Sequence, residues 1–518
     1  MAFTFPSLAL FRTTRVAVRV ATRAAWPFAL CGVLASCTVG PPYVKPVAPE
    51  LTGYTASPLP DTLTAPESGA LGPQNFEYGA PVAPHWWEHF GSHDLDRMMA
   101  QALERNPTLQ AAQHTLEQTR YDLKAQEGIF YPQVSLAAGL SRERSPGATS
   151  GGLAPPVVYN LFTGQLNISY YPDAFGLNRL VVQNAQAQVD VAHEQLRAAQ
   201  LVIEGNVAAA AIGLAALDGQ IEATEKSIAD QQALYDLIRT QYEAGAVSQL
   251  ALATQETQLS NTQAELPVLQ LARDRTRHLL ATFLGEFPSQ ANGMAIARLS
   301  ALHLPPTLPV SLPATLVRVR PDVRAAEAQL RAANAQVGEA VARLYPNVVL
   351  AASLGQQSNY WSALFDPASR LWQLAAIAAA PIFEGGTLRA QKHAAEAAYL
   401  AVFDNYRGTV LTAFRDVADA LRALQRDATA LDERSRALSS AQTSFELART
   451  QYEAGAVDYL GLLTSEVQVE NARNAYIVAQ AQRYQDTVGL YVALGGGVID
   501  ADAENVAAGL TPTAPRGN

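Results

Sequence analysis

The sequence predicts a mixed α+β membrane protein made of two tandem structural repeats. Three observations predict it. The stretch RTQYEAGAV occurs at both 239–247 and 449–457, two long segments are proline-free and rich in Ala, Gln, Leu and Glu, and four short segments alternate between apolar and polar residues. Four strands are too few to close a barrel in lipid, so several chains must share one. Three chains would supply a trimeric, twelve-stranded β-barrel continuous with a tube of twelve helical positions.

The chain is expected to begin with a lipoprotein signal peptide, residues 1–36. Four arginines with no acid nearby precede a short apolar run, AAWPFALCGVLA: Arg12, Arg15, Arg19 and Arg23. This run is too short to span a bilayer as a mature helix. It ends in LASC, which resembles a bacterial lipobox; this implies cleavage before Cys37, lipidation of that cysteine and, because Thr38 is not an aspartate, sorting to the outer membrane. A general export signal cut near Ala35 is the alternative.

Residues 37–92 are expected to form an N-terminal, lipid-anchored, extended tether, because the stretch TVGPPYVKPVAPELTGY is rich in proline. The only cysteines are Cys31 and Cys37. Since the first leaves with the signal, the mature chain is expected to have no internal disulfide. Loss of the four signal arginines takes the formal net charge from −10 to −14, which argues against nucleic acid as a partner.

The duplication extends far beyond nine residues. Pro107 matches Pro321 and Pro132 matches Pro346, both 214 positions apart, whereas the opening stretch recurs after 210. Such shifts indicate small differences in loop length between two copies of one unit, each read as helix, strand, strand, long helix, turn and return helix. The chain after the tether divides into four parts: repeat 1 at 93–283, a linker at 284–314, repeat 2 at 315–495 and a C-terminal tail at 496–518.

The alternating segments are expected to be strands at about 133–142, 159–171, 347–356 and 371–380. In the first, Val134, Leu136 and Leu140 share one face, while Gln133 and Ser135 take the other. Aromatic residues stand near the strand ends, and about ten alternating residues with terminal aromatics are typical of an outer-membrane strand. A half-buried strand of a soluble sandwich has a similar pattern.

Two long helices are expected at 178–244 and 387–454, each roughly 100 Å long at about 1.5 Å per residue. Their apolar positions are mostly alanine, and their other faces carry glutamine and arginine. This pattern suits a wall of closely packed helices with water on both sides. Pro267 lies in the return helix of repeat 1, has no counterpart in repeat 2, and is expected to kink or split that helix.

The duplicated stretch is expected to reverse the chain from one helix to the next. Gly245 and Gly455 follow the long helices, where a glycine at C′ takes the left-handed conformation that ends a helix. Ser248 and Asp458 are then placed to cap the following helix. The two copies stop agreeing at this point, where Gln249 stands against a tyrosine. Taken alone, the pattern fits a purely structural turn.

The sequence gives no indication of catalysis. It contains no GxSxG motif, Walker loop or CxxC pair. His85, His89 and His93 are spaced four apart, but Gly91 interrupts any helix there, which argues against a metal site. The chain is expected to be no enzyme, to bind no metal or cofactor, and to carry only a covalent lipid on Cys37.

Nearly the whole mature chain resembles the TolC-like outer-membrane efflux proteins, and most closely the lipid-anchored subgroup that serves RND-type multidrug pumps. The resemblance lies in SCTVGPPYVKP (36–46), HWWEHFGSHDLDRMMAQALERNPTL (85–109), LPATLVRVRPDVRAAEAQLRAANAQVGEAVARLYPNV (312–348), APIFEGGTLRA (380–390) and the two Tyr-Glu-Ala-Gly stretches. It implies a homotrimer with a barrel in the outer membrane, a helical tunnel across the periplasm and an equatorial region around the linker. The implied partners are a periplasmic adaptor and an inner-membrane pump.

The resemblance also implies roles for the turns. The hairpin ends would form the periplasmic entrance and contact the adaptor through six residues: Tyr242, Gly245, Ser248, Tyr452, Gly455 and Asp458. The following stretch, DYLGLLTSEVQ, occupies the place where the family narrows its tunnel with a leucine and an aspartate. Leu460 matches the leucine, Thr464 replaces the aspartate, and Glu466 could supply negative charge nearby.

The function implied by the resemblance is passive export of small toxic compounds through an outer-membrane duct. Two alternatives remain at this point. The first is a duct for type I protein secretion, and the second is a periplasm-spanning structural lipoprotein that transports nothing.

Overall fold

The computed structural model describes residues 39–497 except 50, 52, 64–70, 147–154 and 294–296. The expected signal peptide and Cys37 lie outside these residues. Packing of the backbone divides the chain into two compact units. Of the described residues, the first holds 39–45, 117–190 and 327–405, and the second holds those within 46–116, 191–326 and 406–497.

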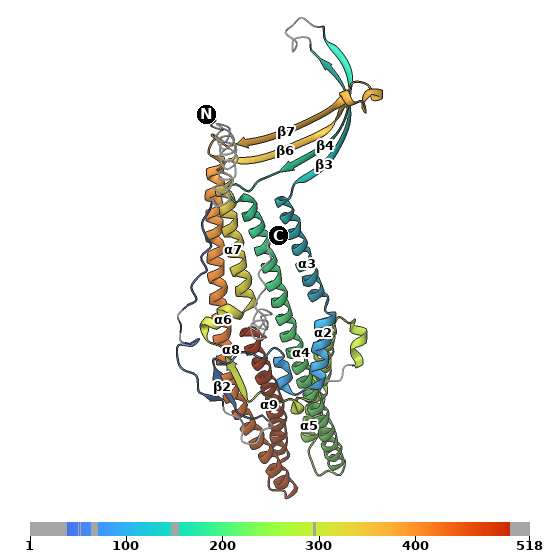
Figure 1. Ribbon diagram of the computed structural model, residues 1–518. Helices are drawn as coiled ribbons and strands as arrows, with labels where there is room; N and C mark the ends of the chain where they lie inside the picture. The colour runs from blue at the N-terminus through green and yellow to red at the C-terminus, as the bar shows by residue number, and fades with distance from the viewer. Residues whose placement is uncertain are drawn as a thin grey trace, which may run out of the picture. The chain divides into compact units, whose positions relative to one another are not determined.

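The first unit contains a four-stranded antiparallel sheet (Figure 1). The strands lie in this order: β3 (Gln133–Ser145), β4 (Val157–Tyr170), β6 (Asn347–Ser358) and β7 (Arg370–Ala379). β3 and β4 pair as far as Ser145 and Val157, whereas pairing between β4 and β6 stops at Phe162 and Ser358. The β3–β4 hairpin therefore extends beyond its neighbours.

Long helices make up most of the remaining structure. The repeats match in length: α4 (Leu177–Glu243) and α8 (Thr387–Glu453) each have 67 residues, and the return helices α5 (Gln249–Phe283) and α9 (Tyr459–Ala493) each have 35. Shorter helices precede each pair of strands: α2 (His93–Arg105), α3 (Pro107–Glu127), α6 (Pro313–Val319) and α7 (Pro321–Ala342). The repeat in the sequence is thus a repeat of helix length and order.

α5 runs unbroken through Pro267, so the expected split of this helix is wrong. A proline inside a helix removes one backbone hydrogen bond, here to the carbonyl of Gln263, and crowds the preceding turn. Both residues are exposed, so water can hydrate the freed carbonyl. The helix tolerates the proline because the lost bond lies on its solvent-facing side.

A second sheet lies in the regions expected to be tether and linker. β1 (Thr62–Leu63) pairs antiparallel with β2 (Gln74–Tyr78), which pairs parallel with β5 (Thr307–Val310). The side chain of Gln74 is fully buried and donates to the Pro305 carbonyl at 3.0 Å. The expectation of an extended tether throughout 37–92 is therefore wrong. Strands this short carry no readable alternation, and their partner is far away in the sequence.

Residues 39–45 have no regular secondary structure and lie against the first unit. The backbone N–H of Val39 donates to the Phe175 carbonyl at 3.3 Å, and the Asn334 side chain donates to the Pro41 carbonyl at 3.2 Å. The ammonium group of Lys45 pairs with Glu327 of α7 at 3.0 Å. The beginning of the described chain is thus fixed to α7 and to the loop before α4.

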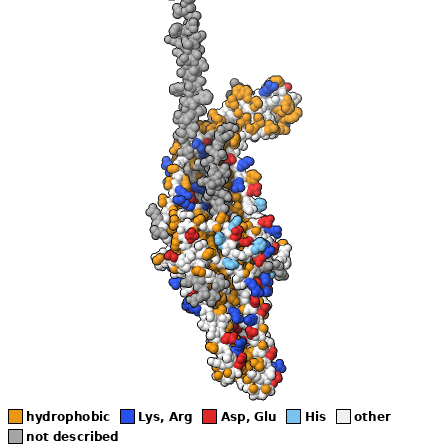
Figure 2. Space-filling view, turned by 60° about the horizontal axis from the view of Figure 1, so that its bottom comes forward, with side chains coloured by type: hydrophobic (Ala, Val, Ile, Leu, Met, Phe, Trp, Pro, Cys, Tyr) orange, Lys and Arg blue, Asp and Glu red, His pale blue; other side chains and the backbone are white. Residues whose placement is uncertain are grey.

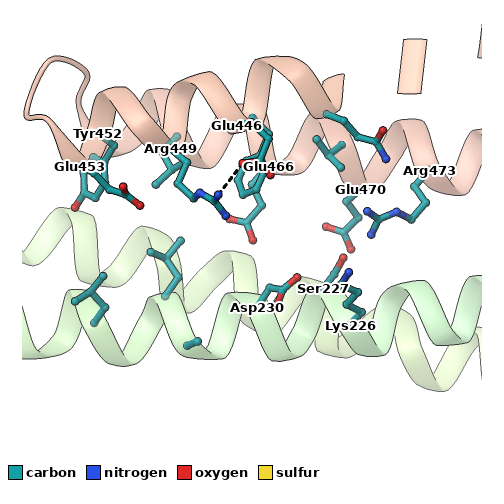
Figure 3. A pocket seen from close by; sticks show the side chains of 17 residues that line it. Lys226, Ser227, Asp230, Glu446, Arg449, Tyr452, Glu453, Glu466, Glu470 and Arg473 are labelled. Carbon is teal, nitrogen blue, oxygen red and sulfur yellow. Dashed lines mark ion pairs between the residues drawn. The ribbon is translucent and has the colours of Figure 1, made fainter. Parts of the chain in front are cut away.

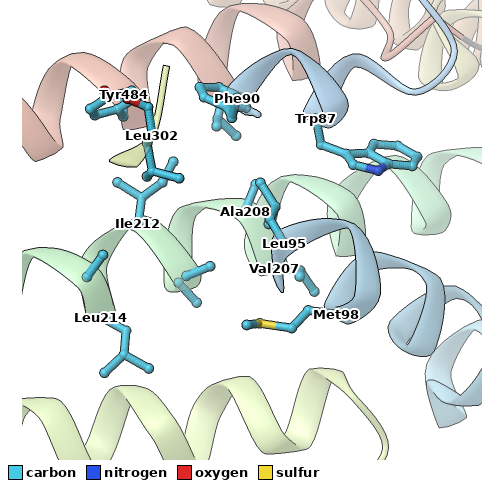
Figure 4. Packing of buried hydrophobic residues seen from close by; sticks show 14 of the residues in the cluster. Trp87, Phe90, Leu95, Met98, Val207, Ala208, Ile212, Leu214, Leu302 and Tyr484 are labelled. Carbon is cyan, nitrogen blue, oxygen red and sulfur yellow. Dashed lines mark hydrogen bonds between the residues drawn. The ribbon is translucent and has the colours of Figure 1, made fainter. Parts of the chain in front are cut away.

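A hydrophobic cluster holds the second unit together (Figure 4). The ring of Trp86, in a short 3-10 helix (Trp86–Phe90), is fully buried and stacks on Tyr491 of α9 with 5.2 Å between centroids. The Tyr484 hydroxyl donates to the Leu302 carbonyl at 2.7 Å. α4 holds the one stretch among the described helices that is long and apolar enough to cross a membrane, but 67% of it is buried within the protein.

Arg320, in the stretch VRVRPDV, connects three helices of the second unit. Its guanidinium pairs with Asp322 of α7 at 2.6 Å and with Asp416 of α8 at 3.2 Å. It also donates to the carbonyl of Ala493, the last residue of α9, at 3.0 Å. Because only 9% of Arg320 is exposed, its donors need partners within the protein. The order Arg-Pro-Asp supplies the cation, the start of α7 and one of the carboxylates.

Two glycines have nearly the same backbone conformation but different surroundings, so comparing alanine substitutions at them distinguishes a steric clash from backbone strain. Gly285 has φ +72° and Gly245 has φ +74°. A Cβ on Gly285 would lie 2.5 Å from the Arg105 carbonyl oxygen, whereas one on Gly245 would meet nothing within 4 Å. We expect Gly245→Ala to lower the free energy of unfolding by about 1 kcal/mol and Gly285→Ala by ~3 kcal/mol. Thermal unfolding of the purified chain, followed by circular dichroism, measures both; equal losses would contradict the steric account.

Candidate functional sites: two hairpin turns and a two-faced sheet

The two turns of the duplicated stretch have the same hydrogen bonds. Gly245 and Gly455 have φ of +74° and +73°. In each turn the glycine N–H donates to the carbonyl of the tyrosine three residues earlier at 2.9 Å, and the next alanine N–H donates to the glutamine carbonyl five residues earlier at 2.8 Å. This is the Schellman arrangement that ends a helix, so the expected left-handed glycines are confirmed.

The expected helix caps are confirmed as well. The hydroxyl oxygen of Ser248 accepts from the Ala251 N–H at 3.3 Å at the start of α5. The carboxylate of Asp458 accepts from the Gly461 N–H at 3.0 Å at the start of α9. All six residues expected at the hairpin ends lie in or directly beside these turns. Their contact with an adaptor stays a prediction.

The two turns differ in the first residue of the return helix. Gln249 is exposed, whereas its counterpart Tyr459 is buried against Ile238 of α4 and Leu463 of α9. The Tyr459 hydroxyl donates to the side-chain oxygen of Gln255 on α5. The second hairpin is therefore attached to the first through Tyr459. The sequence shows that glutamine and tyrosine differ at this position of the repeat. It does not indicate that Ile238 and Gln255 are the partners of the tyrosine.

A cleft of about 830 Å³ lies beside this contact, between α4, α8 and α9 (Figure 3). Acidic and basic side chains point into it from both sides: Asp230, Glu466 and Glu470 with Lys226, Arg449 and Arg473. Glu470 is buried, and its carboxylate accepts a hydrogen bond from the Gln231 side-chain amide at 3.3 Å. One Glu470 oxygen has no hydrogen-bond partner within the described protein.

The three residues expected at the tunnel constriction do not lie together. Leu460 is 60% exposed, and Thr464 is exposed one turn later, with its hydroxyl donating to the Leu460 carbonyl at 2.7 Å. Glu466 points into the cleft instead. Two residues of α-helix correspond to about 200° of rotation, so Glu466 and Thr464 lie on nearly opposite sides of α9.

Burial, and after it the negative charges of Glu470 and Asp230, together raise the pKa of Glu466 to about 7. Burial and the charge of Glu265 also raise the pKa of Glu470, while the Gln231 hydrogen bond and Arg473 lower it. Both carboxyls lose hydration in the cleft without gaining a close cationic partner. The charged form of each of these two carboxyls is therefore less favourable than that of a solvent-exposed glutamate.

The four-stranded sheet of the first unit has two chemically different faces. The strand register aligns rows of residues across all four strands, and the side chains of one row point to the same face. Two alternate rows are apolar: Val134, Ile168, Ala352, Leu374 and Leu136, Leu166, Leu354, Trp372. The row between them points the other way and is polar: Ser135, Asn167, Ser353 and Gln373.

The apolar face is open in the single chain. Leu136 is 80% exposed and Trp372 is 74% exposed, and hydrophobic side chains cover most of the strand region in Figure 2. At the end of the sheet away from the helix connections, Trp361 contacts Phe162 at 5.7 Å and Phe365 at 6.3 Å between ring centroids. An exposed apolar surface of this extent, bounded by aromatic rings, indicates contact with lipid.

Among the described residues, no group of three or more His, Cys, Asp or Glu side chains is arranged to hold a metal ion. His89 instead contacts the Trp86 carbonyl at 3.1 Å through its ring nitrogen.

A sheet with one lipid-facing side and long paired helical hairpins defines a membrane channel. A family model described as outer membrane efflux protein matches residues 98–286 and 312–496, one stretch in each repeat. The chain belongs to the outer membrane efflux protein family. It is an outer-membrane protein that extends into the periplasm, and its homologues are channels rather than enzymes.

Individual relatives match over most of the chain. Outer membrane protein OprJ of Pseudomonas aeruginosa is 30% identical over 482 residues, covering 90% of this chain and 94% of OprJ. The pyoverdine export outer membrane protein OpmQ of the same species is 29% identical over 455 residues, covering 86% of this chain and 94% of OpmQ. The solved structure of the outer-membrane channel OprN is 26% identical with a TM-score of 0.80 and covers 89% of this chain and 99% of that chain. The resemblance inferred from the sequence is confirmed.

The raised pKa of Glu466 predicts a pH-dependent effect of removing its charge. In the folded protein the charged form is disfavoured, so the free energy of unfolding falls as the pH rises from about 4.5, the ordinary value, through about 7. We expect Glu466→Gln to raise the melting temperature at pH 8 by about 1 °C, the shift that about 1 kcal/mol produces in a chain of this length, and to have little effect at pH 4.5. The exposed Glu453, in the same cleft, supplies the control variant Glu453→Gln. An equal shift for the two variants at pH 8 would refute this assignment.

Proposed function

We propose that three copies of this chain form the outer-membrane exit duct of a tripartite efflux system. Small toxic compounds leave through it passively after an inner-membrane pump delivers them by way of a periplasmic adaptor. The observation that carries this proposal is the two-faced sheet, because a wall that is apolar on one side and polar on the other separates lipid from a water-filled lumen. A solid structural rod has no need of such a wall. Membership of the efflux family supports the same conclusion.

The edges of the sheet support a homotrimer. In one chain, β3 and β7 are edge strands, and each unsatisfied backbone group costs several kcal/mol in lipid. β3 leads away from the helices and β7 leads back toward them, so β7 of one copy can pair antiparallel with β3 of the next. Three copies then give twelve strands that alternate in direction around a closed barrel.

The hairpin turns form the periplasmic entrance in this proposal. The adaptor contacts the turns around Gly245 and Gly455, and the exposed Leu460 and Thr464 narrow the tunnel. Because Thr464 carries no charge, this level of the tunnel has no ring of carboxylates. Tyr459 holds the second hairpin against the first, so the two hairpins differ in how easily they move.

The remaining properties follow from the same assembly. The chain catalyses no reaction and needs no cofactor, because the pump supplies the driving force. Cys37 carries the lipid that anchors the chain to the outer membrane. The pump, rather than the duct, selects the compound that is exported.

A pair of adjacent residues on β3 tests the duct. Leu136 belongs to the apolar face and Ser135 to the polar face. An arginine facing lipid near the bilayer midplane costs about 2–4 kcal/mol, whereas a lumen substitution changes selectivity. We expect Leu136→Arg to reduce the yield of outer-membrane trimer at least ~10-fold, and Ser135→Arg to insert normally and alter the ion selectivity of the pore in planar bilayers.

The wild-type chain should conduct ions as a trimer and restore drug resistance to a strain that lacks it. If the purified wild-type protein is a soluble rod without conductance, the proposal that it forms an export duct is wrong. If the two arginine variants behave alike, the assignment of the faces is wrong.

The lipid anchor is tested separately. We expect Cys37→Ala to abolish labelling by radioactive palmitate while chemical cross-linking still detects the trimer, because the strands and helices that form the barrel lie elsewhere. Cys31→Ala serves as the control, since that residue leaves with the signal and labelling should persist. Palmitate retained on the Cys37→Ala protein would rule out this cysteine as the anchor.

A further inference from the structure

Charged residues in the four-stranded sheet are confined to one end. Strands β3, β4, β6 and β7 contain four of them: Arg142, Glu143, Arg144 and Arg370. Arg142 and Arg144 lie where β3 runs into the β3–β4 loop, and Arg370 lies where β7 leaves the β6–β7 loop. This is the end of the sheet opposite the helix connections. The rest of the four strands is uncharged.

The strand register places the three arginines on one face of the sheet and the glutamate on the other. Leu140 pairs with Phe162 on the apolar face. Arg142 and Arg144 are two and four residues further along β3, so their side chains point to the same face. Arg370 is two residues before Trp372 and so shares the same face. These three side chains, called here the arginine rim, therefore point in the same direction as the apolar rows.

The single acid points the other way. Glu143 pairs in register with Tyr159, and its carboxylate accepts hydrogen bonds from the Tyr159 hydroxyl at 3.2 Å and the Ser141 hydroxyl at 2.7 Å. The arginine rim has no such partner: within the described chain no ion pair joins any of its three guanidiniums to a carboxylate, and all three residues are exposed. Exposed guanidiniums at the edge of an apolar surface, with no carboxylate of the described chain paired to them, are available to bind an anion from outside the chain.

The position of the arginine rim identifies the source of that anion. The aromatic rings of Phe162, which pairs with Leu140 of β3, and of Trp361, in the β6–β7 loop, lie beside the rim, and such rings mark the boundary between hydrocarbon and headgroups. The rim is thus at headgroup depth, on the side of the wall that faces lipid. This step rests on the proposed function, in which the helices are periplasmic and the strand loops face outward.

We propose that the arginine rim binds the phosphate groups of the outer-leaflet glycolipid, lipopolysaccharide. Guanidinium matches phosphate with two parallel hydrogen bonds, and Arg–phosphate pairs are stronger than neutral hydrogen bonds. Three copies of the chain place three such rims around the barrel. Binding at the arginine rim holds lipid against the outward end of the barrel and sets the depth of the barrel in the membrane.

The test uses the purified full-length trimer in nanodiscs of uncharged, zwitterionic phospholipid. Native mass spectrometry measures the apparent affinity for bisphosphorylated lipid A and for lipid A from which both phosphates have been removed. Each arginine near an anionic lipid surface contributes roughly fivefold in affinity. We therefore expect the triple variant Arg142→Gln, Arg144→Gln, Arg370→Gln to bind bisphosphorylated lipid A ~100-fold more weakly than wild type, and dephosphorylated lipid A equally well.

Glu143→Gln is the matched control, because it changes a charge at the same depth but on the opposite face; its affinity for lipid A should equal that of wild type. If the wild-type protein does not distinguish the two lipids, or if the triple variant loses no affinity, the arginine rim is not a phosphate site. Conductance is measured on the same preparations. A triple variant that conducts yet loses selective binding supports the inference, and a wild-type protein that fails to conduct overturns the duct and this inference together.

Discussion

Backbone hydrogen bonding at the two open edges of the four-stranded sheet is the constraint on which the rest of the structure depends. An edge strand in water can bond to solvent, but an edge strand in lipid cannot. A sheet with an apolar face as open as that around Leu136 and Trp372 is stable only when lipid covers that face and another strand covers each edge. In the assembly proposed above, one chain is therefore one part of the wall. The even number of strands, alternating in direction, allows identical copies to complete it without any further element.

The duplication solves the same problem on the helical side. Two hairpins of equal length, each closed by the same glycine turn, give one chain two equivalent pairs of long helices. The copies then diverge in specific contacts. Tyr459 and Gln255 join the second hairpin to the first, whereas Gln249 at the matching position reaches solvent. The repeated turn gives both hairpins the same local geometry, and the residue that follows each cap, Gln249 or Tyr459, differs in its contacts.

The sequence was sufficient to predict the features that repeat at short range. Strand alternation, the proline-free helices and the left-handed Gly245 and Gly455 are each set by neighbouring residues. The sheet of β1, β2 and β5 was not predictable in this way, since pairing between residues about 230 positions apart leaves no local pattern. The orientation of Glu466 was missed for a different reason. The stretch DYLGLLTSEVQ does not show which side of α9 packs against its neighbours, and two residues of helix place Glu466 on nearly the opposite side from Thr464.

The cleft between the hairpins contains opposing contributions to the free energy of their contact. Burial of Tyr459 and Ile238 favours this contact. Burial of Glu466 and Glu470, facing Asp230 of α4, opposes it whenever these carboxyls are charged. A contact stabilised by one buried ring and weakened by neighbouring acids can be separated at a modest cost in free energy, without breaking either helix. The unpaired acids therefore lie where two rigid hairpins meet, and the well-paired Arg320 lies where three helices must stay together.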